Sequence, residues 1–427
     1  MENLGLKNIY ILRKDLRLHE GYLKNSVFCY FWNENNFAME KRSSRYKNFL
    51  KEELLKLKNN IEKKGGKMEI IEGEITNSFS PLVTSVFPEK IIIQKQYLPW
   101  EVEEENFLQK NFSEQVVIND NGFLLTNPGE VLKEDGKPYV VFTPFYNKWQ
   151  KVVFNKKLSE PKAKVQLKEF IEFFSKKIKN YGKDRDYPWK EGTSYFSRYL
   201  NCGVISPESV LNKTLSLDYK DLNGELFIRQ LAWRDFYYQL YYHFPYVLKD
   251  SFREKYKNIF WENNQEFFEK WKKGETGFPI IDAGMRQLIT EGFMHNRMRM
   301  ITASFLTKDL LVDWKKGEEF FMDCLEDGDL ILNNGGWQWS ASTGSDAQPY
   351  FRIFNPISQS EKFDPDGKYI KKYISELRNV PLKYIHQPWK MSLEEQKVAK
   401  VIIGKDYPLP IVNHKEQRIK ALELYQI

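Results

Sequence analysis

The first 125 residues alternate short apolar runs with longer stretches of helical periodicity. The apolar runs are rich in Ile, Val, Tyr and Phe, as buried strands are. They cover residues 8–13, 26–32, 68–71, 90–94 and 116–120. Between the second and third runs, Leu50, Leu54, Leu57 and Ile61 fall on one helical face, and a Gly-Gly pair follows at 65–66. Residues 100–110 form a second helical pattern. The alternation predicts an α/β domain over residues 1–125, with a mainly parallel sheet flanked by helices.

The pattern changes twice further along the chain. Residues 126–170 are rich in turn-forming residues and lysine, which favours a connector laid over the surface. From about residue 171 strand patterns stop and helical ones dominate, for example over 226–244 and 285–314. We therefore predict an all-α domain over residues 171–427. A chain of 427 residues is also longer than one ordinary core accommodates.

Charge and cysteine content narrow the class of protein. The net charge is +7, and residues 1–126 balance 18 Lys+Arg against 18 Asp+Glu, so the excess of 47 over 40 lies beyond them. This excess fits a polyanionic partner, and it fits a merely lysine-rich soluble protein equally well. The three cysteines are far apart and odd in number, which favours neither a disulfide framework nor a metal cluster. Without an apolar run of ~20 residues or a signal-peptide pattern, we expect a cytoplasmic protein.

Conventional catalytic motifs are missing from the sequence. There is no HExxH, GxSxG or Walker sequence, and no GxGxxG follows the first predicted strand. Eight of the 11 tryptophans lie beyond residue 180. This distribution suggests chemistry based on aromatic stacking or electron transfer rather than on protons or metals.

Two polar stretches are candidate ligand sites. Thr193 and Ser194 precede an amphipathic run, so they predict a helix N-terminus that suits a phosphate, although a simple helix cap is the plainer interpretation. Asp327 and Asp329 could bind a metal, accept hydrogen bonds from a ribose, or simply be solvated. A metal is the least favoured of these, because no His or Cys lies at ligand spacing.

Two further stretches combine polar residues with large side chains. In "MHNRMRM" (294–300), Asn296, Arg297 and Met300 share one sector of ~100° on a helix, and Arg299 lies on the other side of Asn296. Such a face could meet a flat polar ring, whereas the ordinary role of a methionine-rich helix is core packing. "NNGGWQWSASTGSDAQPYFRIFNP" (333–356) sets two tryptophans among Asn, Gly and Ser, which are typical of loops and turns.

Several motifs together closely resemble the photolyase/cryptochrome family, and within it the class I cyclobutane pyrimidine dimer photolyases. They are "RKDLRLHE", "WRDFYYQL", "GETGFPIIDAGMRQL", "MHNRMRMITASFLTKDLLVDW" and "LEDGDLILNNGGWQWSASTGSDAQPYFRIFNP". The resemblance covers about residues 8–418 and is most specific over 294–356. It implies an antenna-type α/β domain and a helical domain that binds FAD and DNA. The implied activity is light-driven electron transfer from FADH⁻, which splits pyrimidine dimers in DNA without any metal.

The resemblance also implies roles for individual residues. Those implied to hold the FAD phosphates are Tyr181, Thr193, Ser194, Tyr195, Phe196 and Ser197. Those implied beside the flavin ring are Arg299, Asp327, Asp329 and Asn333, the last facing N5. An electron-transfer chain is implied from Trp337 through Trp314 to Trp261. The implied contacts to the lesion or to DNA phosphates are Arg185, Gln230, Trp233, Asn296, Arg297, Met300, Trp339 and Arg352.

The sequence departs from the family pattern in three places. Gln230 stands three residues before Trp233, where dimer photolyases carry Glu, and Gln there is more typical of (6-4) photoproduct enzymes. We retain the cyclobutane dimer as substrate, because the whole 294–300 helix outweighs one residue. Tyr195 replaces an Arg that is common in bacterial members. Trp100-Glu101 stands where folate-binding members carry Asn-Glu, which favours a deazaflavin or a second flavin over folate as antenna.

Three other classes of protein fit the sequence less well than a photolyase. A cryptochrome photoreceptor would have little need of the lesion-facing residues, and a flavin oxidoreductase would require a nicotinamide fingerprint or a catalytic His or Tyr. A purely architectural DNA-binding protein would leave the tryptophan chain unused. We therefore expect a DNA photolyase that acts on dimer-containing DNA, as a monomer without an obligate protein partner or membrane association.

Overall fold

The computed structural model describes residues 7–426, apart from 121, 157–164, 166 and 218–221. The chain divides into two compact units. Unit 1 comprises Met1–Lys176 and Ser194–His243, and unit 2 comprises Lys177–Thr193 and Phe244–Ile427. Each unit is thus assembled from two stretches of chain, whereas the predicted domains are continuous. The predicted boundaries at 125 and 170 stay predictions.

Unit 1 contains a five-stranded parallel sheet in the order β3-β2-β1-β4-β5. The strands are β1 (Asn8–Leu12), β2 (Ser26–Trp32), β3 (Lys67–Glu72), β4 (Lys90–Gln94) and β5 (Val116–Asn119). Asn8 pairs in register with Ser26 on one side and with Lys90 on the other. All five strands predicted from the apolar runs are confirmed, and so is the parallel arrangement.

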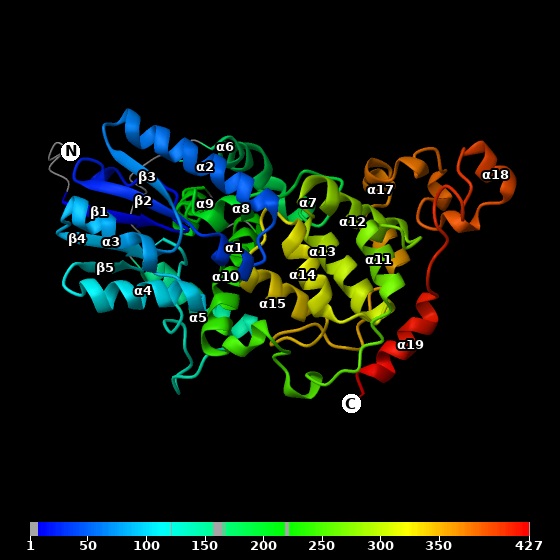
Figure 1. Ribbon diagram of the computed structural model, residues 1–427. Helices are drawn as coiled ribbons and strands as arrows, with labels where there is room; N and C mark the ends of the chain where they lie inside the picture. The colour runs from blue at the N-terminus through cyan, green and yellow to red at the C-terminus, as the bar shows by residue number, and fades with distance from the viewer. Residues whose placement is uncertain (1–6, 121, 157–164, 166, 218–221, 427) are drawn as a thin grey trace. The chain divides into compact units, whose positions relative to one another are not determined.

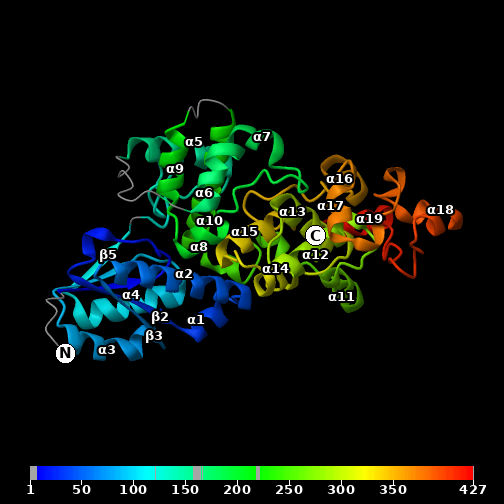
Figure 2. The same ribbon diagram turned by 90° about the horizontal axis from the view of Figure 1, so that it is seen from above.

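Helices connect and flank the strands, as the right-handed crossover rule requires. They are α1 (Glu34–Met39), α2 (Ser44–Lys63), α3 (Ile75–Val86) and α4 (Pro99–Phe112). The chain steps outward from β2 to β3 and then back across to β4, so α2 lies on the other side of the sheet from α3 and α4 (Figures 1 and 2). Ile9, Val27 and Ile91 face α3 and pack around its Phe79. The helices predicted over 44–64 and 100–110 are confirmed.

The carboxyl ends of β1 and β4 carry a buried cluster of charged side chains. Arg13 follows β1 directly, and its guanidinium pairs with Glu104 at 2.7 Å and with Glu105 at 2.9 Å. Lys14 pairs with Glu101 at 2.7 Å. The order of the strands reverses here, which is the position where open α/β sheets bind ligands. In this chain the charged side chains at that edge form ion pairs with one another.

The rest of unit 1 is helical. Its helices are α5 (Phe142–Asn155), α6 (Lys168–Glu172), α8 (Ser197–Cys202), α9 (Pro207–Leu215) and α10 (Leu222–His243). The expectation that residues 126–170 only cross the surface is wrong for α5, because its Trp149 is completely buried. The Trp149 indole donates to the buried carboxylate of Asp235 at 2.8 Å, and Thr126 donates to the same oxygen. Asp235 thereby ties α5 and the segment after β5 to α10.

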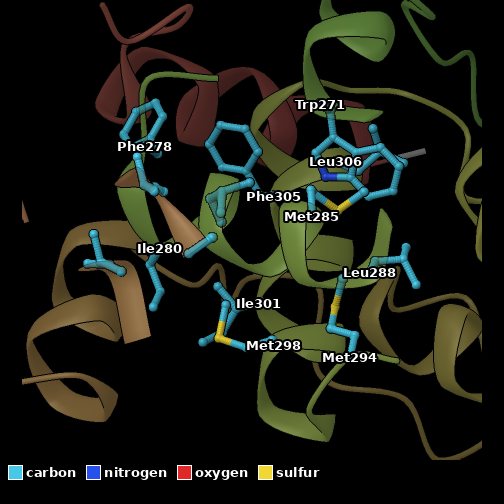
Figure 3. Close-up of a cluster of buried hydrophobic side chains, with 14 of the residues drawn as sticks. Trp271, Phe278, Ile280, Met285, Leu288, Met294, Met298, Ile301, Phe305 and Leu306 are labelled. Carbon is cyan, nitrogen blue, oxygen red and sulfur yellow. The ribbon is translucent and has the colours of Figure 1, made fainter. Parts of the chain in front are cut away.

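Unit 2 consists of helices packed around one apolar core. Its longer helices are α11 (Gln265–Lys273), α12 (Pro279–Glu291), α13 (Asn296–Ser304), α14 (Trp314–Cys324), α15 (Leu330–Ser340), α16 (Pro356–Phe363) and α19 (His414–Leu424). The shorter ones include α7 (Tyr181–Asp184), α17 (Lys368–Tyr373) and α18 (Leu393–Val398). Figure 3 shows part of the core, in which Trp271, Met285 and Leu306 gather. The prediction of a helical C-terminal half is confirmed.

The helical pattern over 285–314 is not one continuous helix. Helix α12 ends at Gly292, which adopts the left-handed conformation (φ 65°), and α13 starts only at Asn296. A π-helical turn over Phe305–Asp309 follows α13 before α14 begins at Trp314. The apolar periodicity continues through both breaks, because α12, α13 and the π-helical turn all bury their apolar side chains in the same core. The sequence pattern therefore hid the breaks.

Candidate functional site

Trp337 and Trp314, two of the predicted electron carriers, both belong to the buried apolar core of unit 2. Both are almost fully buried, with exposed fractions of 2% and 1%. Gly317 lies one turn after Trp314 on α14, so the two residues share a face of that helix. The Trp337 ring rests on Gly317 so closely that a Cβ there would lie 2.2 Å from Cη2 of the indole. The glycine therefore lets one indole approach the helix that carries the other.

The segment just after Trp261 is hydrogen-bonded to the residues that precede the same helix. Asn263 accepts a hydrogen bond from the backbone N–H of Asp313 at 3.0 Å, and its own N–H donates to Leu311 O at 3.2 Å. Trp261 itself is only partly buried and packs against the same core as the other two tryptophans. The structure thus brings Trp337, Trp314 and Trp261 into one cluster, in which the third is the most exposed.

The stretch around Trp337 and Trp339 is helical rather than the loop that its composition suggests. Helix α15 begins after Asp329, whose carboxylate accepts hydrogen bonds from the backbone N–H groups of Ile331 and Leu332 at 3.1 and 3.0 Å. The Asn334 amide donates to Glu318 Oε1 at 2.9 Å. This bond and the one from the Asn333 amide to Glu318 O are tertiary contacts with α14, and they outweigh the low helix propensity of Asn and Gly. Because they come from another helix, the local sequence did not reveal them.

The residues predicted beside a flavin ring gather where α13 meets the start of α15. The Nη2 of Arg299 donates to both carboxylate oxygens of Asp327 at 2.9 Å, and its Nε donates to Met294 O at 2.8 Å; Asp327 is largely buried. Asn333 lies one turn after Asp329 and donates its amide N–H to Glu318 O at 2.9 Å. This leaves the carbonyl oxygen of the Asn333 amide available as an acceptor in addition to that bond. An oriented guanidinium, an amide and two carboxylates suit a polar heteroaromatic ring.

The segment predicted to hold the phosphates differs from expectation in its local structure. Neither Thr193 nor Ser194 caps a helix, because α8 starts later, at Ser197, with Phe196 as the preceding residue and no side-chain cap. Tyr195 instead turns the chain through the left-handed conformation (φ 57°), and the Ser194 hydroxyl accepts from the Phe196 N–H at 3.3 Å. The predicted helix cap is therefore wrong in position.

Two other members of the predicted phosphate group are largely buried. The Phe196 ring is buried among other aromatic rings of unit 1, Phe170 and Phe173 among them. Tyr181 is buried in α7 of unit 2, and the Arg185 guanidinium lies 5.5 Å from its ring centre. Only the backbone of Phe196 is therefore placed to contact a ligand, and its role in binding the cofactor stays a prediction.

The residues predicted to contact DNA phosphates in unit 2 differ in their surroundings. Arg297 donates to Asp186 at 2.8 Å, and its guanidinium also lies 4.3 Å from the centre of the Phe363 ring. Arg185, next to Asp186 in sequence, is half-buried, whereas Arg352 is exposed. Asp186 therefore orients Arg297, a contact across 111 positions that the sequence did not indicate.

The predicted lesion-facing residues of unit 2 have the exposure that this role needs. Asn296 is exposed, and its amide Nδ2 lies 3.8 Å from the sulfur of Met300 one turn along α13. Met298 between them is completely buried in the core. The predicted sharing of one face by Asn296 and Met300 is confirmed, while Met298 has the ordinary packing role. Trp339 is half-buried and lies two residues along α15 from the buried Trp337.

Unit 1 holds Gln230 and Trp233 one turn apart on α10, both half-buried. The Gln230 amide Nε2 donates to Leu226 O at 3.1 Å within the same helix. One face of Trp233 is covered by the Phe142 ring of α5, with the ring centroids 3.6 Å apart and the planes 4° from parallel. Nothing in the local sequence linked Phe142 with Trp233, which lies 91 positions further on.

Comparison with known proteins decides the family. Residues 8–164 match the sequence model described as DNA photolyase, and residues 227–427 match the one described as the FAD binding domain of DNA photolyase. The deoxyribodipyrimidine photo-lyase of Alkalihalophilus pseudofirmus is 41% identical over 415 residues, which cover 87% of this chain and 86% of that protein. The chain belongs to the DNA photolyase family. It therefore contains the FAD-binding domain of a photolyase.

Solved photolyase and cryptochrome structures share the fold. The bacterial class III photolyase of Agrobacterium tumefaciens superimposes with a TM-score of 0.86 at 31% identity, covering 98% of this chain and 97% of that one. A cryptochrome of Synechocystis gives a TM-score of 0.87 at 27% identity, covering 99% of this chain and 100% of that one. The class within the family is therefore not decided by fold, and class I stays a prediction.

Within the described residues, no group of three or more His, Cys, Asp or Glu side chains is placed to hold a metal ion. The described helices include none that is both long and apolar enough to cross a bilayer. Cys29 and Cys202 are buried, Cys324 is half-buried, and none of the three forms a disulfide.

Proposed function

We propose that this photolyase splits cyclobutane pyrimidine dimers in DNA by light-driven electron transfer. The observation that carries the proposal is the match over both units to a deoxyribodipyrimidine photo-lyase at 41% identity. FAD bound in its reduced, anionic form would supply an excited electron, which breaks the two bonds joining the pyrimidines and then returns to the flavin. The protein's residues have to bind and orient the two rings and exclude water from them. None of these tasks requires a metal or a proton relay.

The Arg299–Asp327 pair and Asn333 are proposed to hold the flavin ring. Two anchors, Asp327 on Nη2 and Met294 O on Nε, fix the plane of the Arg299 guanidinium, so its remaining N–H groups have a defined direction. The Asn333 amide is fixed by its bond to Glu318 O. An amide can both donate and accept, so it can adapt to the ring nitrogen whose protonation changes with redox state.

Trp337, Trp314 and Trp261 are proposed to re-reduce oxidised flavin under light. Indoles are oxidisable, and the packing of Trp337 on Gly317 places it beside the helix of Trp314. The hydrogen bond between Asn263 and Asp313 places the segment of Trp261 beside the start of the same helix. The half-buried position of Trp261 makes it the member that an external reductant can reach.

Gln230 is the residue that bears on the choice of lesion. With one amide hydrogen engaged by Leu226 O, its carbonyl oxygen can accept a hydrogen bond from a base edge, as a carboxylate does. We therefore propose that Gln230 serves dimer recognition in place of Glu. The (6-4) photoproduct is the second candidate lesion, because Gln at this place is more typical of (6-4) enzymes.

The test offers purified, chemically reduced protein two oligonucleotides, one with a cyclobutane thymine dimer and one with a (6-4) photoproduct. Illuminated and dark samples are compared by product analysis. Light-dependent loss of the cyclobutane dimer alone supports the proposal. Repair of the (6-4) product alone would assign Gln230 to that lesion. Loss of neither, with flavin bound and photoreducible, would favour a cryptochrome-type photoreceptor.

The remaining parts of the proposal concern partners and an antenna. Positive charge in residues 127–427 is proposed to bind DNA phosphates, with Arg185, Arg297 and Arg352 among the contacts. An antenna chromophore in the α/β domain remains a prediction, with a deazaflavin or flavin favoured over folate. A monomeric state and a cytoplasmic location belong to the same proposal.

A further inference from the structure

The stack of Phe142 on Trp233 stands out among the aromatic contacts of unit 1. Its centroid distance of 3.6 Å and angle of 4° describe two rings in full face-to-face contact. Most aromatic pairs in proteins are offset or edge-to-face instead. Phe142 is buried, with an exposed fraction of 2%, whereas Trp233 is only half-buried. A base can therefore stack only on the face of Trp233 that Phe142 leaves free.

The position of Phe142 is itself well defined. It is the first residue of α5, and the hydrogen bond from Trp149 to Asp235 fastens that helix to α10, which carries Trp233. The Arg229 guanidinium, one turn before Trp233, lies 5.3 Å from the Phe142 ring centre and 4.5 Å from that of Tyr146. Phe142 and Tyr146 are also nearly parallel, with planes 17° apart. Phe142 thus belongs to a layered set of planar groups that ends at Trp233.

We infer that Phe142 is a positioning residue, which holds the Trp233 ring in the plane needed to stack on a flipped-out pyrimidine dimer. This inference rests on the proposed function. A half-buried tryptophan without a backing ring has rotameric freedom, and ordering it on binding costs affinity. Phe142 orders the ring beforehand. Phe142 acts through the flat face of its ring, so another aromatic residue should be able to take over its role, whereas an aliphatic residue of similar size should not.

The experiment compares Phe142→Leu, Phe142→Tyr and a control, Phe145→Leu, in the full-length flavoprotein. Phe145 is equally buried on the same helix, but its ring packs on Phe236 at 5.2 Å and meets the Phe142 ring only at a tilt, with the centroids 6.4 Å apart. Binding to a dimer-containing oligonucleotide and to the same oligonucleotide without the dimer is measured for each. Thermal melting and flavin content report any general loss of structure.

Phe142→Leu is expected to lower the preference for dimer-containing DNA roughly 2- to 12-fold, the range of measured aromatic pair contributions. Binding to undamaged DNA, which depends on phosphate contacts, should be unchanged. Phe142→Tyr and Phe145→Leu should keep the wild-type preference. If Phe142→Leu does not fold, Phe142→Met gives the same comparison with a more adaptable side chain.

A double-mutant cycle separates positioning from a general structural role. In a Trp233→Ala background, Phe142→Leu should cause no further loss of preference, because the ring that it positions is gone. An equal loss in both backgrounds would overturn the inference, and so would a wild-type preference in Phe142→Leu. If wild-type protein itself does not distinguish dimer-containing from undamaged DNA, the proposed function fails instead.

Discussion

Replacing Trp337 by phenylalanine should slow the photoreduction of oxidised flavin and spare the repair of dimers by pre-reduced protein. The substitution removes the indole but keeps a ring in a site where Trp337 contacts Phe321 at 4.9 Å and Trp271 at 6.1 Å. Phenylalanine is much harder to oxidise than tryptophan. The first step of the proposed chain is therefore lost, while the flavin-side and lesion-side residues are untouched.

The structural cost of this substitution should be small enough to leave a folded flavoprotein. The buried Trp337 indole N–H has no hydrogen-bond partner among the described residues, so its removal leaves no new orphaned group. What is lost is the burial of a few ring atoms and the packing on Gly317, about 1–3 kcal/mol of the unfolding free energy. A domain of ordinary stability tolerates a loss of this size.

The assay follows the visible absorbance of oxidised flavin under illumination with an external reductant. Trp389→Phe is the control, because Trp389 packs against the same unit 2 core, with its ring 5.7 Å from that of Phe278. Photoreduction should be strongly slowed in Trp337→Phe and normal in Trp389→Phe, with dimer repair by chemically reduced protein intact in both. Equal photoreduction in Trp337→Phe and wild type would refute the proposed electron path.

Three further predictions follow from the same structure. Gly317→Ala should displace the Trp337 ring, cost about 1–3 kcal/mol in denaturant unfolding and slow photoreduction; normal photoreduction would contradict this. Burial raises the pKa of the Asp309 carboxyl, which is paired with His414, to about 6. Stability should therefore fall as pH rises from about 4 through about 6, by up to about 3 kcal/mol. In Asp309→Asn the free energy of unfolding should vary less with pH over that range. The same pH dependence as in wild type would exclude Asp309 as the cause. Gln230→Glu should keep or improve dimer repair, so near-complete loss of repair would contradict the proposed role of Gln230 in dimer recognition.

Features that depend on local periodicity were predictable from the sequence. The five strands and the helices α2 and α4 lie where the apolar spacing placed them, because burial on one face imposes a period on the chain. The common face of Asn296 and Met300 followed from the same geometry. The break after α12 did not, since the residues on both sides of Gly292 bury the same face of the chain.

Features that depend on distant residues could not be read from local patterns. Helix α15 contains Asn and Gly in its middle and is supported by hydrogen bonds to Glu318 of α14. The orientation of Arg297 depends on Asp186, and that of Trp233 on Phe142. Each of these partners is distant in the sequence, so only the folded chain shows which side chain supports which predicted site residue.

Light-dependent loss of a single dimer is the activity that the proposed function requires. Protein reduced in the dark is mixed with an oligonucleotide carrying a single cyclobutane thymine dimer, and the intact pyrimidines are counted before and after a period of blue light. We expect the number of intact pyrimidines to stay constant in the dark. In the light, dimer loss should grow with light dose, beyond one turnover per flavin. Dimer loss in the dark, or none in the light from protein that retains its reduced flavin, would contradict the proposed function.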